Sequence, residues 1–108
     1  MSSCAQSPIL EDKALEATSF LKKIANKDRL MIVCRLIQGE CALRDLEEGL
    51  GLRQPSLSQQ IGELREAGII EGRREGKQMF YRLCDPRAER LVNTLHQIFC
   101  NAAEPRAL

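Results

Sequence analysis

The sequence predicts a mostly α-helical fold with a single β-hairpin, in the order α-α-α-α-β-β-α. Apolar residues recur at helical spacing through most of the 108 residues, and the period changes to that of strands after Gly68. A chain of this length forms one domain with a modest buried fraction, which a second copy would increase. With no Trp, one Tyr and three Phe, the core must be aliphatic.

The first part of the chain predicts a tail and two helices. Residues 1–10 are rich in Ser and lack periodicity, so we expect a flexible N-terminal tail that contains an exposed Cys4. The folded domain is expected at residues 11–101, with a C-terminal tail at 102–108. A helix is predicted at 11–25. Asn26 or Asp28 caps a second helix, which runs to Gln38 and is apolar nearly all round, so it should be central.

Residues 42–68 predict two helices joined by the short turn Gly51-Leu52-Arg53. The second helix is expected from Gln54, with Pro55 in its first turn and Leu57, Ile61 and Leu64 as its buried stripe. No acidic residue occurs between positions 49 and 62, so amides and hydroxyls suited to base edges and phosphates dominate the other face. An ordinary surface helix is the alternative. The candidate DNA-binding residues here are Gln54, Ser56, Ser58, Gln59 and Gln60.

Residues 69–74 and 78–83 form two short β-type runs separated by Glu75-Gly76-Lys77, which indicates a hairpin. The hairpin is basic, with Arg73, Arg74, Lys77 and Arg82 against Glu71 and Glu75. A basic hairpin directly after a helix-turn-helix is a wing that can follow the phosphate backbone, so the predicted fold is a winged helix-turn-helix. A solvated hairpin whose charges prevent edge aggregation is the alternative. The candidate contacts are Arg73, Arg74, Lys77 and Gln78.

The last predicted helix opens at Asp85-Pro86 and runs to about Asn101. The apolar residues of the first and last helices exceed what one small subunit can cover, which predicts a homodimer. These residues are Leu21, Ile24, Leu91, Leu95 and Ile98. Sixteen basic and fifteen acidic residues nearly balance, so any nucleic-acid footprint must be local. The chain has no signal peptide and no membrane-length apolar run, so we expect a cytoplasmic protein without a membrane partner.

Enzyme chemistry is not predicted. The sequence has no Cys-x-x-Cys, no Cys–His signature and no glycine-rich phosphate loop, so neither catalysis nor a cofactor is expected. Its five cysteines, in a reducing compartment, argue for thiol chemistry or simple packing and against a disulfide framework.

Three segments, residues 21–32, 53–68 and 73–83, resemble the ArsR/SmtB winged-helix repressors. The resemblance covers roughly residues 13–101. It implies a homodimer, recognition of double-stranded operator DNA by the Gln54 helix, a wing at 70–83, and an inducer that lowers operator affinity.

The metal sites of that family are incomplete in this sequence. In the arsenic-sensing branch two cysteines precede an Asp-Leu pair. Asp45-Leu46 are present, but the cysteine positions hold Ala42 and Arg44. In the zinc-sensing branch Asp85 matches the first ligand, and the remaining positions fall on Arg87, Ile98 and Asn101. His96 is the only histidine, so no metal is expected.

Cys34 and Cys100 match the dithiol branch of the same family in position and local sequence. That resemblance implies that reactive sulfur species, persulfide or polysulfide, or another oxidant join the two thiols and release the operator. Two alternatives stay open: Cys34 as a small core residue, and a metal- or metalloid-responsive repressor with thiolate ligands from Cys34, Cys100 or Cys41. Cys100, near a chain end, is expected to react first. Cys4, Cys41 and Cys84 have no assigned role.

Overall fold

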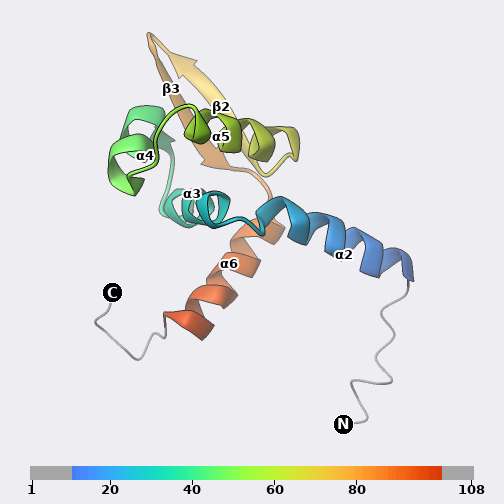
Figure 1. Cartoon of the computed structure of the whole chain (residues 1–108). Helices are drawn as coiled ribbons and strands as arrows, with labels where there is room; N and C mark the ends of the chain where they lie inside the picture. The colour runs from blue at the N-terminus through green and yellow to red at the C-terminus, as the bar shows by residue number, and fades with distance from the viewer. Residues whose placement is uncertain (1–10, 101–108) are drawn as a thin grey trace.

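The predicted order of four helices, a hairpin and a last helix is confirmed, with one additional short strand, in a computed structural model that describes residues 11–100 (Figure 1). The two predicted tails, Cys4 and Asn101 lie outside the described residues. The elements are α2 (Glu11–Ile24), α3 (Lys27–Ile37), β1 (Cys41–Ala42), α4 (Leu43–Leu50), α5 (Ser56–Glu66), β2 (Ile70–Glu75), β3 (Gln78–Leu83) and α6 (Pro86–Phe99).

Helix ends follow the predicted capping signals. Asn26, and not Asp28, caps α3: its Oδ1 accepts the backbone N–H groups of Asp28 and Arg29 at 2.9 and 3.1 Å. Asp85 caps α6 by accepting the Arg87 N–H at 2.8 Å. Gly68 follows α5 with a φ of 76°, in the left-handed region expected there. The local sequence therefore sets where these helices begin and end.

The sheet contains one strand that the sequence pattern did not predict. The strand order is β1-β3-β2, with antiparallel neighbours, and β1 pairs Cys41 with Tyr81 and Ala42 with Phe80. The helix expected from Ala42 begins one residue later, at Leu43. Cys41 and Ala42 are both buried, and their extended backbone pairs with the edge of β3 that β2 leaves free. Two residues are too few for an alternation pattern.

The core lies between α3, α4, α5 and the sheet, with α3 at its centre. Ile32, Val33 and Leu36 of α3 are buried. The predicted stripe of Leu57, Ile61 and Leu64 on α5 is confirmed, because all three side chains are at most 3% exposed. This packing anchors the predicted recognition helix to the body.

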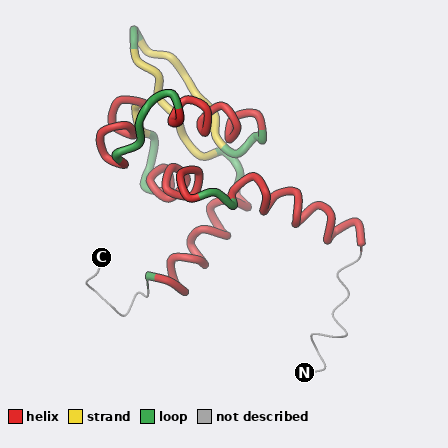
Figure 2. Tube along the Cα trace, in the orientation of Figure 1, coloured by secondary structure: helices red, strands yellow, loops and turns green. Residues whose placement is uncertain are grey.

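Helices α2 and α6 extend away from this body, as Figure 2 shows. Only Ile24 of α2, and Ala88 and Val92 of α6, are buried. The expectation that Ile24 contributes to a dimer surface is therefore wrong. Ile24 is 3% exposed because the last turn of α2 lies against the core. Among residues 11–100, no helix is both long enough and apolar enough to cross a membrane.

Candidate nucleic-acid interface and thiol pair

The exposed face of α5 carries the residues predicted to contact DNA. Helix α5 begins at Ser56, so Gln54 and Pro55 lie just before it, and Pro55 is the N-cap residue. Gln54 Oε1 accepts hydrogen bonds from the Ser58 backbone N–H at 3.1 Å and from Ser58 Oγ at 2.6 Å. Gln59 is exposed, and among the described residues its side chain makes no hydrogen bond. Gln59 therefore has its full hydrogen-bonding capacity available.

Gln60 has a different environment from its neighbour. Its Oε1 accepts a hydrogen bond from Arg29 Nε at 2.7 Å, which joins α5 to α3. Arg29 also donates to the Lys23 carbonyl oxygen at 3.3 Å and lies 3.9 Å from a carboxylate oxygen of Glu63. Gln60 thus helps to position α5, a role that the sequence pattern did not indicate.

Arg73 on the predicted wing is engaged within the protein. Its Nε and Nη2 donate to the two Glu40 carboxylate oxygens, each at 2.8 Å, and its Nη1 donates to Glu75 at 2.8 Å. The guanidinium also lies 4.8 Å from the centre of the Phe80 ring. The Arg73 hydrogen bonds hold the pKa of Glu40 below its usual value, and Glu40 in turn raises the pKa of Arg73.

The remaining wing candidates are exposed and differ from Arg73. The Arg74, Lys77 and Gln78 side chains are all exposed. Within residues 11–100, no ion pair involves Arg74 or Lys77. These two cations are therefore available to a phosphate backbone.

The two predicted sensor thiols come from helices that pack against each other, α3 and α6. Cys34 is half-buried on α3, and Cys100 is exposed at the C-cap of α6. Burial raises the pKa of the Cys34 thiol, and the charge of the nearby Cys100 raises it further. Both thiols are free, and the exposed Cys100 is the more accessible to a reagent.

The other two described cysteines differ from this pair. Cys41 is buried in β1, and burial raises the pKa of its thiol. Cys84 is exposed, and its Sγ donates to the Gly68 carbonyl oxygen at 3.4 Å. Partial desolvation of the Cys84 thiol raises its pKa as well. In the described part of the chain, no three His, Cys, Asp or Glu side chains gather where they could hold a metal ion.

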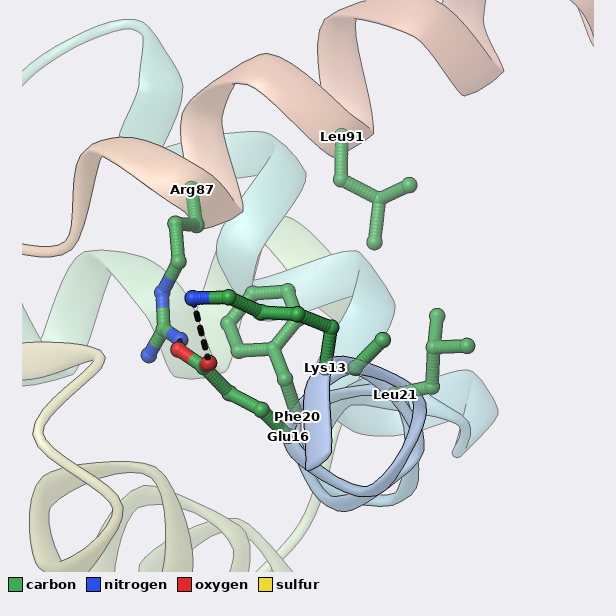
Figure 3. Close-up of a pocket in the computed structure, with 7 residues that line it drawn as sticks. Lys13, Glu16, Phe20, Leu21, Arg87 and Leu91 are labelled. Carbon is green, nitrogen blue, oxygen red and sulfur yellow. Dashed lines mark ion pairs between the residues drawn. The ribbon is translucent and has the colours of Figure 1, made fainter. Parts of the chain in front are cut away.

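Exposed apolar side chains lie on both α2 and α6. The most exposed large side chains among them are Leu15, Leu21, Ile98 and Phe99, at 64%, 46%, 63% and 78% exposure. Between the helices lies an open groove of about 460 Å³, lined by Ala17, Phe20, Leu21 and Leu91 and bordered by Lys13, Glu16 and Arg87 (Figure 3). The Arg87 guanidinium lies 4.5 Å from the centre of the Phe20 ring and joins the two helices.

Comparison with known proteins gives consistent matches. A family model described as "Bacterial regulatory protein, arsR family" matches residues 26–71. The biofilm growth-associated repressor of Agrobacterium fabrum is 50% identical over 97 residues, which span 90% of this chain and 83% of that protein. The crystal structure of the transcriptional repressor BigR from Xylella fastidiosa has a TM-score of 0.80 at 50% identity, covering 83% of this chain and 92% of that one. Reduced HlyU from Vibrio cholerae gives 0.79 at 33% identity, with 83% and 95% covered.

Proposed function

The chain belongs to the arsR family of bacterial regulatory proteins, and from this premise we propose that it is a homodimeric, thiol-controlled repressor. It binds operator DNA in the reduced state and leaves it when Cys34 and Cys100 become cross-linked. The observation that carries the proposal is the packing of α6 against α3, the helices that carry Cys100 and Cys34.

The DNA-binding part of the proposal rests on α5 and the hairpin. The exposed amide of Gln59 suits base edges in a major groove, and Arg74 and Lys77 suit phosphates. Two such units are needed, because paired recognition helices read half-sites about 34 Å apart. The exposed apolar side chains of α2 and α6 supply a surface on which a second copy can pack. A regulator of this type acts on DNA in the cytoplasm.

The chemistry begins at the exposed thiol. The Cys100 thiolate attacks one sulfur of a low-molecular-weight disulfide, and a thiolate leaves. Cys34 then attacks Cys100 Sγ and displaces the second thiolate, so that two protein thiols lose two electrons and two protons. A persulfide donor instead transfers its outer sulfur to Cys100, and the attack of Cys34 then expels hydrogen sulfide. A direct link needs the two Cα atoms within about 7 Å.

Helix α3 provides a route from this link to the DNA-binding helix. It carries Cys34, and its N-terminal Arg29 holds Gln60 on α5. A cross-link restrains α3 against α6 and so alters the setting of α5 relative to the dimer. A coupling free energy of about 1–3 kcal/mol weakens binding roughly 5- to 150-fold, which is enough to switch a promoter.

The test compares thiol variants on an operator selected in vitro from random duplexes. Cys100→Ser and Cys34→Ala should each bind like the reduced wild type, because neither thiol is proposed to touch DNA. Persulfide or disulfide should no longer release either variant from the operator. The double variant should be no more impaired than either single one. Cys84→Ser is the matched control, since it removes an exposed thiol outside the pair.

The outcomes separate the thiol switch from its alternative. Mass spectrometry should find one intramolecular link per subunit, between Cys34 and Cys100. If Cys100→Ser leaves the operator with the wild-type dose dependence, the dithiol switch is wrong. A metal- or metalloid-responsive repressor would instead show thiolate charge-transfer bands on titration and would lose them in both variants.

A further inference from the structure

The wing has two chemically different faces. In the register of the hairpin Arg73 pairs with Phe80 and Arg74 with Met79, and alternate residues of a strand point to opposite sides. We call the side that carries Ile70, Gly72, Arg74, Met79, Tyr81 and Leu83 the inner face, because Ile70 and Tyr81 belong to the core. The outer face carries Glu71, Arg73, Glu75, Gln78, Phe80 and Arg82.

The charges of the outer face neutralise one another. Arg82 forms an ion pair with Glu71, its partner across the hairpin. Arg73 is held by Glu75 on its own strand and by both carboxylate oxygens of Glu40, just before β1. Two guanidinium groups thus meet three carboxylates, which leaves this group of side chains with a net charge of −1.

The contact between Arg73 and Glu40 also crosses the whole sheet. Glu40 precedes β1, Arg73 belongs to β2, and β3 lies between them with Phe80 beneath the guanidinium. The ion pair therefore ties the hairpin to the segment that connects α3 to β1. Three of the Arg73 guanidinium N–H groups already donate to carboxylate oxygens, and the negative charge of those carboxylates would repel an approaching phosphate.

The inner face and the turn carry Arg74 and Lys77, which form no ion pair within residues 11–100. Arg74 lies on the inner face, whose Ile70 and Tyr81 share the core cluster with the buried stripe of α5, and Lys77 lies in the turn. Figure 1 shows that the tip of the β2–β3 hairpin projects beyond α5. A duplex that meets the exposed side of α5 would therefore meet the inner edge of the hairpin tip, where positive charge is not neutralised.

We propose that the wing contacts the phosphate backbone only through Arg74 and Lys77, and that Arg73 is a positioning residue that braces the wing against Glu40. This inference rests on the proposed DNA-binding function and assigns the wing face that performs it. It replaces the expectation that the neighbouring arginines 73 and 74 act alike. An arginine already neutralised by carboxylates releases no DNA counterions on binding, whereas an unpaired one does.

The experiment uses Arg73→Gln and Arg74→Gln, adjacent substitutions with the same change in net charge. Binding of the full-length reduced protein to a labelled random-sequence duplex is measured by anisotropy over a series of salt concentrations. Arg74→Gln and Lys77→Gln should each lower the slope of log K against log salt by about one unit. Arg73→Gln should keep the wild-type slope.

Thermal unfolding at fixed protein concentration provides the second measurement. Arg73→Gln and Glu40→Gln should lower the melting temperature by similar amounts. The melting temperature of the double variant should be no lower than that of either single variant, because both changes remove the same contact between Arg73 and Glu40. Arg74→Gln should melt like the wild type.

The results distinguish failure of this inference from failure of the proposed function. If the wild type binds the duplex and Arg73→Gln loses as much slope as Arg74→Gln, the assignment of the faces is overturned. Additive melting shifts for Glu40→Gln and Arg73→Gln would overturn the bracing role. If the reduced wild type does not bind duplex DNA at all, the proposed function itself fails.

Discussion

Gln59 and Gln60 are adjacent, chemically identical and expected to behave differently on substitution. Gln60 accepts a hydrogen bond from Arg29 Nε at 2.7 Å, whereas among the described residues the Gln59 side chain accepts none. We predict that Gln60→Ala destabilises the fold and that Gln59→Ala instead changes base preference. The two variants have the same composition, so each is the control for the other.

The size of the Gln60 effect follows from the state of its partner. The Arg29 side chain is 18% exposed, so water reaches it poorly once the amide is removed. Its remaining contacts are the Lys23 carbonyl oxygen at 3.3 Å and Glu63 at 3.9 Å. A hydrogen bond to a charged group contributes about 1.5–3 kcal/mol. Since these contacts compensate in part, we expect Gln60→Ala to lower the free energy of unfolding by about 1–2 kcal/mol. In a domain of about this size, each kcal/mol corresponds to roughly 4–8 °C in melting temperature.

Calorimetry and binding to single-base operator variants together check this prediction. Gln59→Ala should melt like the wild type and lose about 1–3 kcal/mol of discrimination at one base position. Gln60→Ala should melt earlier and weaken the binding of all sequences by a similar factor. A normal melting temperature for Gln60→Ala, with altered preference at one base, would show that Gln60 reads DNA and that its contact with Arg29 is incidental.

Three further predictions concern assembly, thiols and pH. Phe99→Glu changes the most exposed large apolar side chain described; the variant should sediment as a monomer and should not bind the operator. Sedimentation of the wild type as a monomer at micromolar concentration would contradict this prediction. At pH 7 iodoacetamide should alkylate the exposed Cys100 before Cys34, whose pKa is raised. Peptide mapping should show that the alkylation rates of the two thiols become similar only above about pH 9. The folded-state pKa values of Glu40 and Asp85 are lowered, so their stabilisation is present above the ordinary carboxyl pKa of about 4 and is lost as pH falls through the lowered values. The melting temperature of Asp85→Asn should therefore fall less than that of the wild type as the pH is lowered through that range.

Much of the fold was predictable because its signals are local. Periodicity located the helices, Asn26 and Asp85 marked two helix starts, and Gly68 marked the end of α5. The buried stripe of α5 followed from spacing alone. What the sequence pattern missed depends on contacts between distant segments. β1 exists because Cys41 pairs with Tyr81, and no pattern within two residues indicates that partner.

The candidate interface shows why residue type and position along the chain do not assign roles at single-residue resolution. Neighbours 59 and 60 are both glutamine, and neighbours 73 and 74 are both arginine, so composition and spacing treat each pair as equivalent. The fold separates them through partners that lie more than thirty positions away, Arg29 for Gln60 and Glu40 for Arg73. In both pairs, one residue has a distant partner, and within residues 11–100 the side chain of its neighbour makes no hydrogen bond or ion pair. A sequence therefore predicts that a face binds DNA before it can predict which side chains do, because the assignment depends on which of them the protein has already engaged.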